Sequence, residues 1–144
     1  MIRILLVDDQ MAVRRGLRMR LALEADMLVV GEAGDAEGAL ALAPVVRPDV
    51  IVMDIELPQI DGITAAAGLR DLIPSAAVVI LSIHEGPSIR ARARAAGAAA
   101  FVGKHEAGDQ LVPAIRRAAA SRATQQTSRQ EPGKVGDEQR PKDG

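Results

Sequence analysis

The chain has 144 residues, of which 48% are apolar and 26% are charged, and its formal net charge is −1. This composition is typical of a single globular domain and gives no general attraction to nucleic acid or to anionic membranes. The absence of cysteine excludes disulfides and thiolate metal sites. A short apolar run near the N-terminus meets Asp8, far short of an export or membrane-spanning segment, so we expect a cytoplasmic protein that does not act at a membrane.

Apolar runs and helical patterns alternate along the chain. Runs typical of buried strands occupy residues 2–7, 28–30, 50–53, 78–81 and 99–102. Helical patterns lie at residues 12–25, 36–46, 63–72 and 88–96, and a fifth helix is expected to begin at Ala107 or Asp109. This alternation predicts an α/β fold, with βαβ units forming a doubly wound parallel sheet.

The fifth helix and the residues after it are less regular. Pro113 lacks the N–H of an interior helical residue, so it fits only if the helix starts late or bends there. Residues 121–144 contain one valine and no other large apolar side chain, too little to repay the entropy of ordering them. We therefore predict a folded domain over residues 1–120 and a disordered polar tail over residues 121–144.

The rest of the chain is organised around residues 49–62, DVIVMDIELPQIDG. The apolar residues 50–53 predict a strand that is buried on both faces of a parallel sheet. The strand must end near Asp54, because Pro58 follows closely and Asp61-Gly62 signals a turn. Asp54 then lies at the carboxyl end of a buried strand, where open α/β sheets carry their chemistry. Taken alone, Asp54 is explained equally well as a loop cap.

Two further carboxylates, Asp8 and Asp9, follow the first strand. In a sheet of order 2-1-3-4-5 the first and third strands are neighbours, so these carboxylates and Asp54 converge at the topological switch point. Carboxylates 4 Å apart repel by roughly 4 kcal/mol per pair at an effective dielectric near 20, so such a cluster needs a cation or a raised pKa. Mg²⁺ meets this requirement and brings phosphate chemistry with it. The simpler alternative is that Asp8 and Asp9 form a polar cap before the first helix.

Ser82 and Lys104 follow the fourth and fifth strands, where their side chains could reach the same edge. Each is unremarkable alone, Ser82 as a loop cap and Lys104 as a solvated charge. A hydroxyl and an ammonium group, however, are suited to binding phosphoryl oxygens. Five polar residues at the carboxyl ends of four strands therefore favour a phosphoryl site over coincidence.

These residues lie in motifs that resemble the response-regulator receiver domains of two-component signalling, which have a flavodoxin-like (βα)5 fold. The resemblance covers the chain from its first residue to about residue 121. It rests on VDD (residues 7–9), MDIELPQIDG (53–62), LSIHE (81–85) and the Lys104 that follows FVG. The segments VVGEAGDAEGAL (29–40) and RPDVIVMDI (47–55) are most similar to the NarL/FixJ-type subfamily.

The resemblance implies roles for the acidic residues. Asp54 would be the phosphoacceptor, attacking a phosphohistidine on a sensor histidine kinase or a phosphotransfer protein to form an acyl phosphate. Asp9 and Asp54 would bind Mg²⁺ directly, with the backbone carbonyl of Glu56 as a third protein ligand and Asp8 acting through water. The chain would be a phosphoacceptor without a separate catalytic domain, and not an enzyme in its own right.

The resemblance also implies a conformational switch. Lys104 would pair with the phosphoryl oxygens, and Ser82 would hydrogen-bond them and draw its loop inward. Phe101, the only aromatic residue of the chain, occupies the family's rotating switch position. Its movement would remodel the surface of the fourth helix, the last strand and the fifth helix, where a second copy of the chain could bind after phosphorylation.

The sequence departs from the subfamily in the region where its members carry a DNA-binding domain. Its members usually continue into a helix-turn-helix DNA-binding domain, whereas this sequence continues into a polar tail. We therefore expect no direct DNA binding by this chain. A stand-alone receiver, a phosphate shuttle in a relay and the receiver fragment of a NarL/FixJ-type transcription regulator remain as alternatives.

Three other protein classes fit less well. A haloacid-dehalogenase-type phosphatase carries its nucleophile after the first strand in a D-x-D pattern, which DDQ at residues 8–10 does not match. A nucleotide-binding module needs a phosphate-binding loop such as G-x-x-x-x-G-K-[ST], which the sequence lacks. A DNA-binding protein could use the arginines at positions 90, 92, 94, 116 and 117, but the sequence offers no recognition helix and its net charge is slightly negative.

Overall fold

Five parallel strands form one sheet in the order β2-β1-β3-β4-β5, which confirms the predicted topology. The computed structural model describes the backbone of residues 1–138 and the side chains of residues 1–124. The strands are β1 Ile2–Val7, β2 Met27–Ala33, β3 Val50–Asp54, β4 Ala77–Ser82 and β5 Ala100–Gly103. β2 is longer than predicted because it forms an edge of the sheet, where its half-exposed residues lack the continuous apolar pattern of a central strand.

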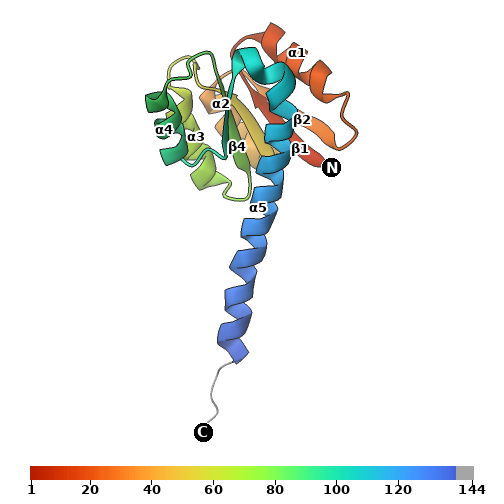
Figure 1. The fold of residues 1–144 in the computed structure, drawn as a ribbon, viewed down its shortest axis with the longest axis vertical. Coiled ribbons are helices and arrows are strands. Elements are labelled where there is room, and N and C mark those ends of the chain that lie inside the picture. Colours follow the sequence, from red (N-terminus) through yellow and green to blue (C-terminus); the bar gives the residue numbers. More distant parts are fainter. Residues whose placement is uncertain (139–144) are drawn as a thin grey trace.

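Helices cover both faces of the sheet (Figure 1). They are α1 Met11–Leu21, α2 Ala36–Val46, α3 Gly62–Leu72, α4 Pro87–Ala95 and α5 Ala107–Glu138, with a short 3-10 turn, η1 Lys104–Glu106, before α5. The buried side chains of α1 and α5 pack on one face, and those of α2, α3 and α4 pack on the other. No helix in the described part of the chain is long and apolar enough to cross a membrane.

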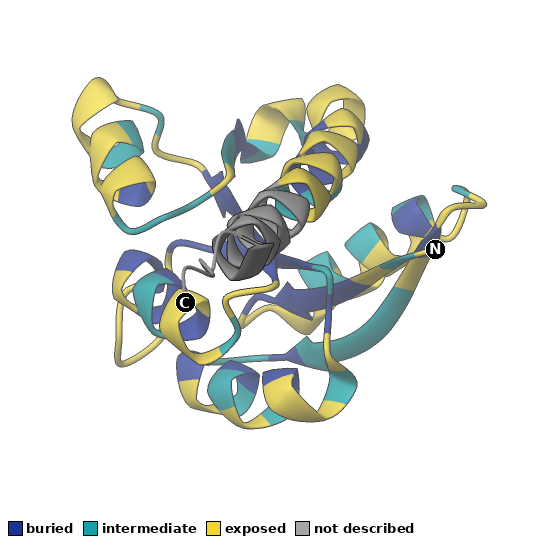
Figure 2. Ribbon diagram, turned by 90° about the horizontal axis from the view of Figure 1, so that it is seen from below, coloured by how far each residue is buried: buried dark blue, intermediate teal, exposed yellow. Residues whose placement is uncertain are grey.

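Alternation along the strands supplies the two halves of the core. In β1, Leu5 and Val7 face the α2, α3 and α4 layer, whereas Ile4 and Leu6 face α1 and α5. Every residue of β3 is buried, as the apolar run at residues 50–53 predicted. The central strands are therefore packed on both faces. Figure 2 shows their buried segments in dark blue, and β3 holds its terminal Asp54 on a rigid element.

The start of α3 is tied closely to the end of β3. The Asp61 carboxylate caps α3 by accepting a hydrogen bond from the Thr64 N–H at 2.9 Å, and hydrogen bonds from the Thr64 backbone and side chain lower the pKa of Asp61. The Gly62 N–H donates to the Ile55 carbonyl at 2.8 Å. A Cβ atom at Gly62 would lie only 2.5 Å from the Asp54 carbonyl oxygen, so this approach requires glycine.

α5 differs from its prediction at two places. It begins at Ala107, the earlier of the two predicted starts, and Pro113 lies inside it at an exposed position, where water can bond the carbonyl that the proline leaves without a partner. The predicted disorder from residue 121 also differs from the structure, in which residues 121–138 continue the helix. Alanines at positions 118–120 favour the helix, and no glycine or proline stops it before Pro132. The remainder of the predicted tail, residues 139–144, lies outside the described residues.

Candidate functional site

Polar side chains gather where four of the five strands end. Asp8 follows β1, Asp54 is the last residue of β3, Ser82 is the last residue of β4, and Lys104 follows β5. Asp8, Asp54 and Ser82 are 1%, 3% and 0% exposed, and they are the buried polar or charged residues among the described side chains. Burying such groups is costly unless they are paired or functional, so this edge of the sheet is the candidate site.

Lys104 reaches across the sheet edge to two of the carboxylates. Its Nζ donates to Asp54 Oδ2 at 2.9 Å and to Asp8 Oδ2 at 3.4 Å. Carboxylate oxygens of Asp8, Asp9 and Asp54 all lie within 4.8 Å of one another. The convergence predicted for these four residues is therefore present in the structure.

The electrostatics of the cluster disfavour negative charge on Asp8. Burial raises the pKa of Asp8, and the charge of Asp54 raises it further, against the lowering effect of the hydrogen bond from the Gln10 N–H and of Lys104. Burial alone lowers the pKa of Lys104, but its hydrogen bond to Asp54 and the charges of Asp54 and Asp8 outweigh burial and raise it. Lys104 is therefore firmly cationic at neutral pH, and one ammonium group faces three carboxylates.

The three carboxylates fit a hard divalent cation. They offer oxygen ligands from two neighbouring strand ends, with Asp8 and Asp54 buried and Asp9 exposed to solvent. Mg²⁺ binds through one or two carboxylates, keeps several waters and accepts phosphate oxygens in its remaining positions. A cation here would also relieve the charge that burial disfavours on Asp8.

The loop after β3 holds the second oxygen of Asp54. Its Oδ1 accepts a hydrogen bond from the Glu56 N–H at 3.0 Å, so both carboxylate oxygens of Asp54 are bonded. The Glu56 side chain, to which we assigned no role, makes a 3.0 Å hydrogen bond with His84 Nε2 from the loop after β4. His84 lies in the LSIHE motif, but its position beside Glu56 depends on two loop paths that no local pattern specifies.

Ser82 and Phe101 lie on neighbouring strands but are not engaged with Asp54. Ser82 Oγ accepts a hydrogen bond from the His84 N–H at 2.9 Å, and within the described residues no hydrogen bond joins Ser82 to Asp54. The Phe101 ring is half-buried on β5 and lies under the Arg90 guanidinium, whose Cζ is 4.6 Å from the ring centroid. The hydroxyl and the ring are thus held by contacts outside the acidic cluster.

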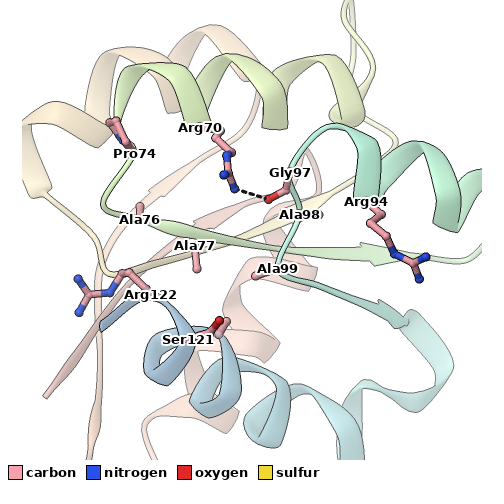
Figure 3. Close-up of a pocket in the computed structure, with 11 residues that line it drawn as sticks. Arg70, Pro74, Ala76, Ala77, Arg94, Gly97, Ala98, Ala99, Ser121 and Arg122 are labelled. Carbon is pink, nitrogen blue, oxygen red and sulfur yellow. Dashed lines mark hydrogen bonds between the residues drawn. The ribbon is translucent and has the colours of Figure 1, made fainter. Parts of the chain in front are cut away.

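A separate hollow of about 320 Å³ lies at the opposite end of the sheet (Figure 3). Small residues at the start of β4 and in the loop between α4 and β5 line much of it. Arg70 donates a hydrogen bond to the Gly97 carbonyl at 3.0 Å, while the guanidinium groups of Arg94 and Arg122 point away from the hollow. Because these arginine side chains do not converge on the hollow, it lacks a cluster of charged groups like the one at the acidic edge.

The fold and the acidic edge together define a flavodoxin-like domain of the CheY-like class. Residues 4–116 match the family model described as the response regulator receiver domain, and the chain belongs to this family.

Curated relatives support this assignment. The chain is 38% identical over 122 residues to the transcriptional regulatory protein YxjL of Bacillus subtilis (strain 168), covering 85% of the chain and 56% of that protein. It is 37% identical over 123 residues to the DNA-binding transcriptional activator DevR/DosR of Mycobacterium tuberculosis, covering 85% of the chain and 57% of that protein. A protein-glutamate methylesterase/protein-glutamine glutaminase of Cereibacter sphaeroides is 38% identical over 122 residues, which cover 83% of the chain and 33% of that protein. The chain spans about half the length of the transcription regulators it matches.

Solved structures show the same fold. The two-component response regulator of the LuxR family from Aurantimonas sp. SI85-9A1 has a TM-score of 0.80 and 37% identity, covering 83% of this chain and 86% of that one. The signal receiver domain of the putative response regulator NarL from Mycobacterium tuberculosis has a TM-score of 0.77 and 34% identity, covering 83% and 96%. These neighbours confirm the expected similarity to the NarL-type subfamily.

Proposed function

We propose that this chain is cytoplasmic and that its Asp54 accepts a phosphoryl group from the phosphohistidine of a sensor histidine kinase or phosphotransfer protein. One observation carries the proposal: Asp54 is buried, its Oδ2 is bonded to Lys104 Nζ at 2.9 Å, and two further carboxylates lie within 4.8 Å. An oxygen of Asp54 attacks phosphorus as the P–N bond to the donor histidine breaks. The imidazole nitrogen keeps that electron pair, and an acyl phosphate forms.

The neighbouring groups hold the charge of the transferring phosphoryl group. Lys104 already contacts the acceptor carboxylate and can exchange this contact for a phosphoryl oxygen. Asp8, Asp9 and Asp54, with the backbone carbonyl of Glu56, would hold Mg²⁺. When bound, this ion neutralises phosphoryl oxygens and so lowers the barrier to transfer.

Ser82 links the chemistry to a change of conformation. A phosphoryl group on Asp54 offers the Ser82 hydroxyl a charge-assisted hydrogen bond, about twice as strong as a neutral one. Drawing Ser82 toward Asp54 moves the loop after β4 and opens space for Phe101. The surface of α4, β5 and α5 changes as a result, and we assign partner binding, including a second copy of the chain, to this surface. The chain itself acts as a phosphoacceptor and not as a separate enzyme.

Intact-mass spectrometry tests the acceptor residue. With Mg²⁺ and acetyl phosphate, the protein should gain the mass of one phosphoryl group, and Asp54→Asn should abolish the gain. Asp71→Asn, which changes an exposed carboxylate on α3, should be labelled like the unmodified protein. Continued labelling of the Asp54→Asn protein would exclude Asp54 as the acceptor.

A second candidate function is that of the receiver part of a DNA-binding transcription regulator. The relatives from Bacillus subtilis and Mycobacterium tuberculosis are named as transcription regulators, and the chain covers little more than half of each. This coverage favours the receiver part of a DNA-binding regulator as the alternative role. For the chain as given, we still predict no sequence-specific DNA binding, and a gel shift at physiological salt that depends on promoter sequence would contradict this.

A further inference from the structure

Glu85 joins two loops that border the phosphoacceptor site. It lies between β4 and α4, and its Oε2 is 3.0 Å from His105 Nε2 in the 3-10 turn that begins with Lys104. Its Oε1 accepts a hydrogen bond from Arg90 Nη2 at 3.4 Å, and its backbone carbonyl accepts one from Arg90 Nε at 3.3 Å. One residue therefore contacts both the loop that carries Lys104 and the first turns of α4.

Arg90 extends this set of contacts to Phe101. Its guanidinium lies over the ring at 4.6 Å from the centroid, a cation–π arrangement that holds the half-buried ring against α4. The side chain of Glu85 is 28% exposed and that of Arg90 is 41% exposed, so solvent only partly screens their interaction. The orientation of Arg90 over the ring thus depends on Glu85.

The end of β5 is shaped to receive the Glu85 carboxylate. A Cβ atom at Gly103 would lie 2.6 Å from Glu85 Cδ and 2.7 and 2.8 Å from its two oxygens. The φ angle of Gly103 is −68°, which any residue adopts, so its backbone conformation does not require glycine. A side chain at this position would displace the Glu85 carboxylate, which lies directly against the strand end that precedes Lys104.

We propose that Glu85 is a positioning residue that braces the resting conformation of the switch. The inference rests on the proposed function, in which phosphorylation draws Ser82 toward Asp54. Because Ser82 ends β4 and Glu85 lies in the short loop that follows it, this movement pulls the Glu85 carboxylate away from Gly103 and His105. Arg90 then loses the partner that holds it over Phe101, and the ring is released. The contacts of Glu85 therefore stabilise the resting conformation relative to the activated one. The interactions of the phosphoryl group must outweigh these contacts before the activated conformation is populated.

Fluorine NMR tests the brace, because Phe101 is the only phenylalanine and 4-fluorophenylalanine labels this one site. Glu85→Gln keeps the size of the side chain but removes its charge. We expect its resonance, without ligand, to move toward that of the unmodified protein with Mg²⁺ and beryllium fluoride. The beryllium fluoride concentration at half-saturation should fall about two- to fivefold, which corresponds to the loss of one partly exposed ion pair.

Two further variants separate the brace from a general charge effect. Asp109→Asn removes an exposed negative charge from the first turn of α5 and should leave the resonance unchanged. Gly103→Ala expels the carboxylate without altering it, so it should reproduce the effect of Glu85→Gln, and the double variant should show no further change. A Glu85→Gln resonance that matches both the unmodified protein and Asp109→Asn would overturn the inference.

These experiments distinguish failure of the Glu85 inference from failure of the proposed phosphoacceptor function. If the unmodified protein does not respond to Mg²⁺ and beryllium fluoride, the phosphoacceptor proposal fails. The ligand-free spectra still decide whether Glu85 positions Phe101, because that comparison needs neither the metal nor the phosphoryl analogue.

Discussion

Replacing Asp8 with asparagine should stabilise the ligand-free protein, although it removes a contact of Lys104. Asp8 is 1% exposed, and burial, together with the charge of Asp54, raises its pKa. A carboxyl group whose pKa is raised by folding destabilises the fold at pH values above that pKa. Asparagine keeps the oxygen that accepts the 2.9 Å hydrogen bond from the Gln10 N–H, so the loop geometry is retained.

The magnitude follows from the distances in the cluster. The attraction between Lys104 and Asp8 at 3.4 Å is worth about 5 kcal/mol at an effective dielectric of 20. Repulsion from Asp54, within 4.8 Å, is at least about 3.5 kcal/mol, and the exposed Asp9 adds a smaller, screened amount. These terms nearly cancel, and the desolvation of a buried carboxylate remains, offset in part by the hydrogen bond from Gln10. We expect Asp8→Asn to raise the free energy of unfolding by about 1–3 kcal/mol.

Thermal unfolding at pH 7.5 in EDTA measures this effect. The midpoint of Asp8→Asn should lie about 5–10 °C above that of the unmodified protein. Lowering the pH should reduce the difference between the two midpoints. The unmodified protein gains stability as pH falls through the raised pKa of Asp8 toward the usual pKa of 3.8. Asp71→Asn serves as the control and should lie within about 0.5 kcal/mol of the unmodified protein. A midpoint for Asp8→Asn at or below that of the control would refute the electrostatic argument.

Three other variants test separate parts of the structure. Gly62→Ala should lower the free energy of unfolding by about 1–3 kcal/mol in a urea titration, because the new Cβ would lie 2.5 Å from a backbone oxygen at the end of β3. An unchanged midpoint would show that the backbone moves to accommodate the Cβ. Arg116→Gln should lower the melting temperature at pH 7, because a hydrogen bond from Arg116 lowers the pKa of Asp26. This deficit should shrink as pH falls below the usual pKa of 3.8, since the stability is lost as pH falls through the lowered pKa; a deficit that does not depend on pH would assign the effect to packing. Ser82→Ala should still gain one phosphoryl group, yet the fluorine resonance of Phe101 should respond weakly to Mg²⁺ and beryllium fluoride; a full response would disprove the coupling.

The sheet and the acidic edge were predictable because both depend on short, local patterns. The unbroken apolar run before Asp54 is the signature of a strand buried on both faces, and the structure buries every residue of β3. Parallel strands place their carboxyl ends at one edge of the sheet. The strand pattern alone therefore predicts that the residues following these strands lie close together. Asp8 and Lys104, which are 96 positions apart in the chain, come within 3.4 Å for this reason.

The contacts between loops were not predictable in the same way. Glu85 meets His105 only because the two loops run side by side and Gly103 has no side chain between them. No periodicity specifies such an encounter. The end of α5 was also missed, because sparse apolar content was interpreted as disorder, whereas a helix that already packs on the sheet continues where helix formers follow it.

The length of α5 gives the domain a mechanical property. Among the described side chains of α5, Ala118 is the last that is buried in the core, and the helix continues away from the sheet beyond it (Figure 1). At 1.5 Å per residue, the stretch from Ala118 to Glu131, just before Pro132, is about 20 Å long. A tilt of about 5° at the sheet would displace the far end of this stretch by about 2 Å, roughly the reach of one hydrogen bond. α5 can therefore work as a lever arm, converting a sub-ångström repacking beside β5 into a displacement large enough to make or break a contact far from the phosphoacceptor.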